Sequence, residues 1–304
     1  DKDLTLITRP DGQTVMFNYE SSGRLDNVTI PSGVVDYSYN ATTGQVSSIA
    51  FPGGETCTYL YDGFLLKKET WAGSVAGNVS HHYGTGFRVL TQKINGSNSV
   101  NFQYDNDSLL TGAGGLALTR DAQNGLLIGT TLGNVTDSWT YNTFAEPTSY
   151  VASYSASPVF QNSFTRDKLG RIKTKTETID GVSASYEYTY DVAGRLTEVK
   201  KDNVVSSTYV YDSNGNRTSF TGQSGTVAGT YDDQDRLTQY GANTYTYSAN
   251  GELQSKTVGT DATSYTYDVL GNLTNVTLPD GAQISYVIDG QNRRVGKRVG
   301  GALT

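Results

Sequence analysis

The residues best suited to acid–base or metal chemistry are few. The chain of 304 residues has two histidines, His81 and His82, which are adjacent. Neighbouring residues on a strand face opposite sides of a sheet, so this pair is poorly placed to share a metal ion. A Ser-His-Asp device would need one of the two, but no segment resembles a nucleophile elbow. We therefore expect the two histidines to be surface or turn residues, not catalysts.

The carboxylates are numerous but offer no distinctive constellation. The segment DSNGNR (212–217) has oxygen ligands at alternate positions, like the start of a calcium loop. The glycine after the third ligand and the distal glutamate of such a loop are absent. Asp232, Asp233 and Asp235 form a second acidic cluster, which we interpret as a solvated turn. Among 30 acidic residues, no pair is marked out as a glycosidase site. The sequence predicts no catalytic residue, metal ligand or cofactor site.

Aromatic side chains are the remaining candidates for binding. Trp71 and Trp139, together with the many tyrosines, could stack on sugar rings or grip a partner. We favour the alternative that they form cross-strand ladders within a sheet. The single Cys57 excludes an internal disulfide framework, and we expect it to be a buried small side chain.

One motif recurs along the chain and sets the architecture. YDVAGRLTEV (190–199) is echoed by YDSNGNRTSF, YDDQDRLTQY and YDVLGNLTNV, and near the start by YESSGRLDNV. A catalytic motif normally appears once, whereas a recurrent motif with a period near 20 residues is typical of a solenoid. The motif residues that we assign to the repeated turn are Tyr19, Gly23, Arg24, Tyr190, Asp191, Gly194, Arg195, Tyr211, Asp212, Gly215, Tyr231, Asp232, Arg236, Tyr267, Asp268 and Gly271.

Each motif predicts the end of a hairpin. Asp191 can accept a hydrogen bond from a backbone N–H two residues on, and Gly194 can adopt the left-handed conformation that closes the turn. The opposite turns are segments such as PSG (31–33) and PDG (279–281), which suit tight turns. Between these turns we expect strands, for example over residues 25–30 and 34–39.

Strand periodicity supports an all-β fold. In residues 183–191, Ala184, Tyr186, Tyr188 and Tyr190 alternate with polar residues, as on a strand with one packed face. No long segment has the apolar spacing of a helix. The sequence therefore predicts an all-β, spiralling antiparallel hairpin ribbon, a β-solenoid or shell, as one continuous array of about 14 repeats over residues 1–304.

Composition limits the partners. The formal net charge is −7 and the pI is about 4.9, which disfavours nucleic acid as a partner. No apolar run approaches the roughly 20 residues of a membrane helix, so we expect no membrane insertion by this segment. The chain opens and closes inside repeats, and we interpret it as truncated at both ends.

These motifs resemble the YD repeats of bacterial rearrangement-hot-spot (RHS) proteins over essentially the whole chain, with residues 70–150 the poorest match and their register open. The insecticidal toxin-complex C component and the teneurins are more distant relatives. The resemblance implies a hollow β-shell that encloses a C-terminal toxin domain. The self-cleavage segment and toxin domain of the family would follow residue 304, so neither activity is assigned to this chain.

The resemblance also implies partners and a location. The expected partner is the protein's own C-terminal toxin or cargo domain, with a delivery system or a cell surface as a further partner. The expected location is secreted or cell-surface, as part of a larger protein. The alternative function is a teneurin-like adhesion surface that binds carbohydrate or a receptor.

Overall fold

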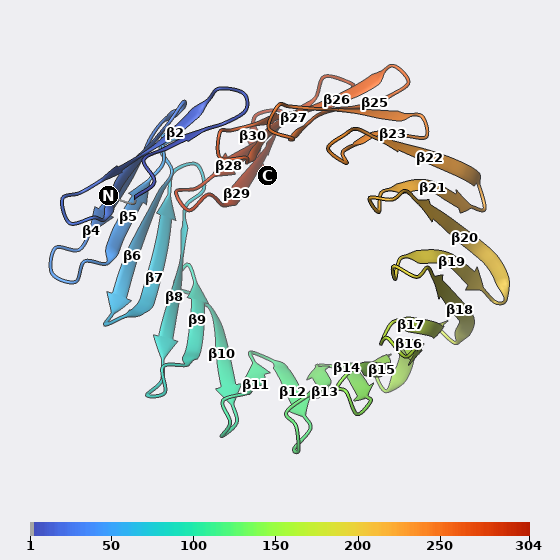
Figure 1. The fold of residues 1–304 in the computed structure, drawn as a ribbon. Coiled ribbons are helices and arrows are strands. Elements are labelled where there is room, and N and C mark those ends of the chain that lie inside the picture. The colour runs from blue at the N-terminus through green and yellow to red at the C-terminus, as the bar shows by residue number, and fades with distance from the viewer. Residues whose placement is uncertain (1–2) are drawn as a thin grey trace. The chain divides into compact units, whose positions relative to one another are not determined.

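The computed structural model describes residues 3–304, which contain β-strands and turns but no helix. Consecutive strands pair antiparallel, one hairpin after another (Figure 1). The all-β antiparallel fold expected from the sequence is therefore confirmed. The chain divides into two compact units, unit 1 (Asp1–Ser99 and Arg236–Thr304) and unit 2 (Val100–Asp235).

Unit 1 contains two runs of antiparallel strands. The first run, called sheet A, comprises β1 (Leu6–Thr8), β2 (Thr14–Tyr19), β3 (Leu25–Ile30), β4 (Gly33–Tyr39), β5 (Val46–Ala50), β6 (Thr56–Asp62), β7 (Leu65–Ala72), β8 (Gly77–Tyr83) and β9 (Val89–Ile94). The second run, called sheet C, comprises β23 (Leu237–Tyr240), β24 (Asn243–Tyr247), β25 (Leu253–Val258), β26 (Asp261–Tyr267), β27 (Leu273–Thr277), β28 (Gln283–Ile288), β29 (Arg294–Val299) and β30 (Ala302–Leu303).

Unit 2 contains the third run, called sheet B, and its strands follow a curved ribbon (Figure 1). These strands are β10 (Asn98–Tyr104), β11 (Leu110–Ala113), β12 (Leu116–Arg120), β13 (Leu127–Leu132), β14 (Val135–Tyr141), β15 (Pro147–Tyr154), β16 (Ser157–Arg166), β17 (Ile172–Ile179), β18 (Val182–Tyr190), β19 (Leu196–Lys201), β20 (Val204–Tyr211), β21 (Arg217–Gly222) and β22 (Gly225–Tyr231).

The motif tyrosines end their strands at a bulge. The register shifts between Ser38 and Tyr39, between Thr189 and Tyr190 and between Val210 and Tyr211. An extra residue at a bulge bends the strand and increases its twist, which lets a ribbon curve. In the segment whose register the sequence left open, Tyr83, Tyr104 and Tyr141 also end strands, at the same kind of shift.

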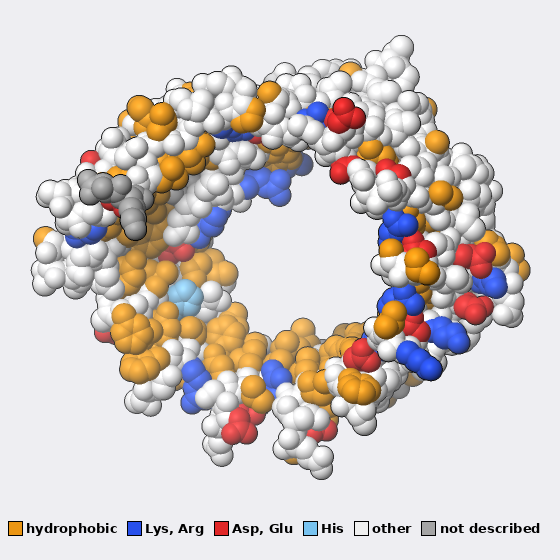
Figure 2. Space-filling view, in the orientation of Figure 1, with side chains coloured by type: hydrophobic (Ala, Val, Ile, Leu, Met, Phe, Trp, Pro, Cys, Tyr) orange, Lys and Arg blue, Asp and Glu red, His pale blue; other side chains and the backbone are white. Residues whose placement is uncertain are grey.

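The two faces of the ribbon differ in chemistry. Along β18, Ala184 and the tyrosines Tyr186, Tyr188 and Tyr190 are half-buried, whereas Ser185, Glu187 and Thr189 between them are exposed, as the alternation predicted. In unit 2 the hydrophobic side chains gather on the concave side of the strands β10–β14 (Figure 2). Within unit 2 the ribbon is thus a single curved layer with an aromatic face and a polar face.

Unit 1 also has a small apolar core. Val15, Val28, Val35 and Ile49 project from sheet A and pack against Val269 of the turn between β26 and β27. Burial of each such side chain stabilises a fold by about 1.5–3 kcal/mol. The core therefore holds a turn of sheet C against sheet A.

Candidate functional site: the repeated turn and the docked turns of unit 1

The aspartate of the motif caps its own turn. Asp191 Oδ1 accepts the backbone N–H of Arg195 at 2.8 Å, and Oδ2 accepts its Nε–H at 2.7 Å. The backbone N–H of Arg195, and then its side chain, hold the pKa of Asp191 below its usual value. Gly194 takes φ +85°, which L side chains rarely adopt. We number the turn from its aspartate, so Gly194 is position 4 and Arg195 is position 5.

The arginine at position 5 connects one turn to the next. The Arg195 guanidinium lies 4.8 Å from the ring centre of Tyr211, one repeat further along, and its Nη1 donates to the Asp212 carbonyl at 2.9 Å. Tyr211 in turn donates its hydroxyl hydrogen to the Leu196 carbonyl at 2.8 Å. Each turn is therefore held both within itself and to its neighbour.

The same arrangement recurs at several copies of the motif. An arginine at position 5 stacks on the tyrosine of the next repeat in Arg24–Tyr39 (4.5 Å), Arg171–Tyr190 (4.6 Å) and Arg236–Tyr247 (5.1 Å). The tyrosine hydroxyl donates to a carbonyl of the preceding repeat from Tyr19, Tyr39, Tyr190, Tyr231 and Tyr247, at 2.6–3.0 Å.

The remaining motif residues lie in these turns as well. Gly23, Gly215 and Gly271 take φ between +83° and +95°. Asp212, Asp232 and Asp268 each accept a backbone N–H from two residues on. Tyr267 ends β26, and burial, followed by the nearby Tyr265, raises its pKa.

Sequence reasoning missed a coupling between position 5 of one turn and position 4 of the next. Where position 5 is asparagine, its amide donates to a polar side chain: Asn216 to Asp235 at 2.6 Å, and Asn272 to Asn292 at 2.5 Å. Asp235 and Asn292 take the left-handed conformation, with φ +60° and +62°. The sequence signal that could have revealed this coupling is that residues 235 and 292, both at position 4, are not glycine.

Two turns of sheet C dock on sheet A within unit 1. At the first, Val269 is only 8% exposed, and Arg9 donates through Nη1 to the Asp268 and Val269 carbonyls while it pairs with Glu252. Next to it, Asn250 Nδ2 donates to Asp11 Oδ2 at 2.6 Å. The first docked turn is therefore fixed by an apolar contact and by polar contacts around it.

The second docked turn buries a carboxylate. Asp289 is 1% exposed and accepts Arg293 Nη2 at 2.7 Å, while Arg293 also pairs with Glu69 of β7. Cys57 is fully buried, as its sequence context predicted, and its thiol lies 3.7 Å from Asp289 Oδ2. Burial, and then the Asp289 charge, raise the pKa of this thiol, so it is an unreactive group.

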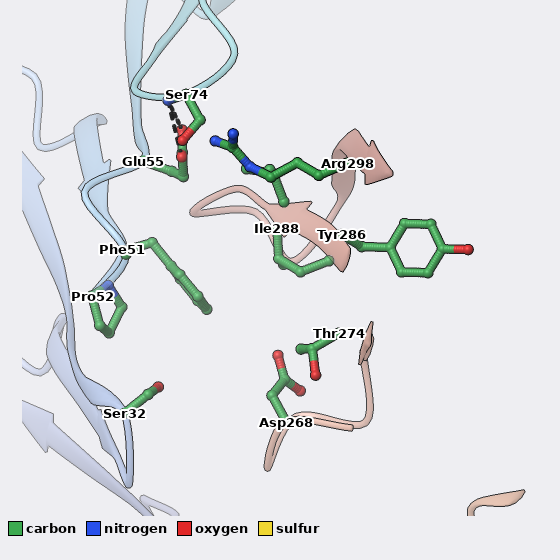
Figure 3. A pocket seen from close by; sticks show the side chains of 12 residues that line it. Ser32, Phe51, Pro52, Glu55, Ser74, Asp268, Thr274, Tyr286, Ile288 and Arg298 are labelled. Carbon is green, nitrogen blue, oxygen red and sulfur yellow. Dashed lines mark hydrogen bonds between the residues drawn. The ribbon is translucent and has the colours of Figure 1, made fainter. Parts of the chain in front are cut away.

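A cavity of about 370 Å³ lies between sheet A and sheet C of unit 1, and Figure 3 shows side chains that line it. Both Glu55 carboxylate oxygens accept the Ser74 backbone N–H at 3.0 Å, and the Arg298 guanidinium points toward this pair. A Cβ at Gly73 (φ +125°) would lie 1.9 Å from Glu55 Oε2, so only glycine fits beside this carboxylate. The lining contains hydroxyl and carboxylate side chains but no histidine or cysteine.

The other chemical candidates are found as follows. His81 and His82 lie on β8, and in residues 3–304 no group of three His, Cys, Asp or Glu side chains is placed to hold a metal ion. Asp212 accepts the backbone N–H groups of Asn214 and Asn216, as in an ordinary turn. Trp139 packs on Tyr150 at 5.0 Å and Tyr150 on Phe160 at 6.0 Å, which makes a cross-strand ladder.

The fold and its turns define a segment of a YD-repeat shell. The family model of the teneurin YD-shell matches residues 1–303, so the chain belongs to the teneurin YD-shell family. No curated protein matches the chain. No helix among residues 3–304 is long and apolar enough to span a bilayer.

Solved toxin-complex structures share the fold. The crystal structure of TcdB2-TccC3 matches with a TM-score of 0.61 at 11% identity, over 95% of this chain and 20% of that chain. The form without its hypervariable C-terminal region matches with a TM-score of 0.51 at 12% identity, over 94% and 18%. The chain therefore spans about a fifth of the length of these relatives.

Proposed function

We propose that this shell segment is a wall that encloses a polypeptide cargo, a toxin domain carried C-terminally in a longer secreted or cell-surface protein. The observation that carries the proposal is the difference between the two faces of the curved ribbon. The concave side in unit 2 is hydrophobic over β10–β14, and exposed Ser, Thr and Glu side chains lie on the other face of β18 (Figure 2).

A curved single layer with such faces suits containment. Apolar surface facing inward favours contact with a partly folded chain, which exposes apolar side chains of its own. The bound cargo is kept from proteases and targets by sterics. No residue of the chain is assigned a chemical step. The motif residues, from Tyr19 to Gly271, stabilise the wall by holding each turn together and to its neighbour.

The docked turns of unit 1 suggest how such a wall is sealed. Val269 and Asp289 each bring a motif turn onto the face of another run of strands and bury it there. In a wall built in this way, buried contacts at these turns hold two runs of strands together, which opposes their separation and the entry of a protease between them.

Limited proteolysis of the longer protein, followed by mass spectrometry, tests the proposal. We expect the region after residue 304 to survive under native conditions and to be digested after denaturation. A Val269→Ser variant should admit the protease sooner, and the matched Val192→Ser variant should not. Immediate cleavage of the downstream region in the unmodified protein would show that nothing is enclosed.

A further inference from the structure

A small basic concavity lies on sheet A, away from the docked turns. It has a volume of about 250 Å³ and is formed by β6, β7, β8 and β9 of unit 1. Its lining includes Lys67, Lys68, Lys93, Ser80 and His82, and contains no aspartate or glutamate. The lining is therefore basic although the chain as a whole has a formal net charge of −7.

The strand register brings these side chains onto one face. Lys68 pairs with Ser80, and Ser80 pairs with Lys93, so the three form one row across β7, β8 and β9. Strands are about 4.8 Å apart, which places the two lysine Cα atoms about 10 Å apart with the serine between them. His82 lies two residues along β8 and therefore on the same face.

The acidic neighbour in sequence faces the other way. Glu69 follows Lys68 directly, but it pairs with Arg293 of the second docked turn, on the opposite face of sheet A. Within residues 3–304, Lys67, Lys68 and Lys93 form no ion pair, whereas Lys175 pairs with Glu177 at 2.8 Å. The row thus concentrates positive charge with no internal counter-charge.

We propose that this concavity binds a tetrahedral oxyanion, a phosphate or sulfate group. The two ammonium groups can donate charge-assisted hydrogen bonds from both sides, and the Ser80 hydroxyl and the His82 imidazole add donors at the centre. The positive charges of Lys68 and Lys93, on either side of Ser80, repel each other, and an anion bound between them offsets that repulsion. The site lies on the face directed away from sheet C, and it goes beyond the containment function.

Titration of the whole chain with inorganic phosphate, read by ³¹P NMR at constant ionic strength, tests the site. We expect saturable binding and a rise in the melting temperature with phosphate, because a ligand that binds only the folded state stabilises it. The Lys68→Gln/Lys93→Gln variant should raise Kd by more than about tenfold and lose the thermal shift. Ser80→Ala, which changes no charge, should weaken binding by a smaller factor.

The matched control variant removes the same number of positive charges from a different part of the chain. Lys168→Gln/Lys173→Gln removes two lysines of unit 2 and should leave Kd within about twofold. Inorganic sulfate and glucosamine 6-sulfate serve as competitors: tighter binding of the ester assigns the site to sulfated sugars, and equal binding assigns it to the free ion. The proposal is overturned if phosphate does not bind saturably, or if the control weakens binding as much as the pocket variant does.

Discussion

Arg195 and Tyr211 belong to different repeats, yet the guanidinium of one lies 4.8 Å from the ring centre of the other. The same arginine is bound by Asp191 of its own turn at 2.7 Å. One side chain therefore links the turn that carries it to the turn that follows, and the ribbon is built from a succession of such links.

The first prediction concerns this link. Arg195→Gln and Tyr211→Leu should each destabilise the chain, with a coupling free energy of about 0.5–1 kcal/mol in a double-mutant cycle. Tyr211→Phe should cost about 1 kcal/mol, because it removes only the hydroxyl that donates to Leu196. Chemical denaturation measures these values. A cycle of Arg195 with the remote Tyr150 should give a coupling near zero, and equal couplings in both cycles would refute the link.

The second prediction compares one motif position in two settings. Val269 and Val192 both follow the motif aspartate, but Val269 is buried in the core of unit 1 and Val192 is fully exposed. Val269→Ser should cost about 2–3 kcal/mol through lost burial and an unpaired hydroxyl, whereas Val192→Ser should change stability by less than about 0.5 kcal/mol. Thermal and chemical unfolding give both numbers. A similar loss in both variants would mean that the first docked turn is not formed.

The third prediction uses position 4 of the turn. Ala145 and Asp235 take φ +62° and +60°, a conformation that costs an L-residue about 1–2 kcal/mol. Ala145→Gly should therefore stabilise the chain by roughly 0.5–1 kcal/mol. Asp235→Gly relieves the same strain but loses the bonds from Asn214 and Asn216, so it should destabilise by about 1 kcal/mol. Shifts of the same sign in the two melting temperatures would disprove the coupling between turns.

The fourth prediction concerns acid. Hydrogen bonds from the turn hold the pKa values of Asp167, Asp191 and Asp212 below the ordinary value of 3.8. For Asp167 and Asp212 the first effect is burial, which raises the pKa, but the turn hydrogen bonds outweigh it. Because the folded pKa is the lower one, the stabilisation is present above about pH 4 and is lost as the pH falls through the folded value.

A triple Asp→Asn variant at positions 167, 191 and 212 tests this prediction. It keeps an acceptor oxygen in each turn but cannot titrate, so its melting temperature should fall less steeply than that of the parent chain between about pH 4 and 2.5. Parallel curves over this range would show that these carboxylates do not govern acid unfolding.

The fifth prediction uses Cys57 as a reporter of the second docked turn. The thiol is fully buried and its pKa is raised, so a thiol reagent should not label it in the native chain. Arg293→Gln removes the pairs with Asp289 and Glu69 and should increase the labelling rate by roughly tenfold or more, because the turn opens more often. Arg195→Gln, the same change at the same turn position in unit 2, is the control. Equal labelling of the two variants would argue against docking through Arg293.

The sequence predicted the local structure well because the local signals are strong. Strand β3 was expected at residues 25–30 and lies there, and the alternation along β18 was visible from its tyrosines. What could not be predicted is which turns are buried. Val192 and Val269 have the same motif context, and their difference arises from contacts between residues more than 200 positions apart, such as Arg9 with Glu252.

The residue on which each motif arginine stacks could not be predicted from the sequence pattern either. The motif showed that Arg195 recurs, but the stacking on Tyr211 depends on the spatial offset between successive turns, which the bulge at the tyrosine sets. The pairing of Asn216 with Asp235 was hidden for the same reason, since the two are 19 residues apart.

The residue at position 4 of a turn contacts the residue at position 5 of the preceding turn, so neighbouring repeats must match in sequence at this junction. The asparagines at position 5, Asn216 and Asn272, meet an aspartate and an asparagine in the next turn. Arg171 is followed by a glycine instead, and its Nη1 lies 3.6 Å from where a Cβ would stand on Gly194. Repeats of this kind are therefore not interchangeable modules. A genetic exchange that moves a repeat with asparagine at position 5 without its successor would lose this pairing, and one that moves the two repeats together would keep it.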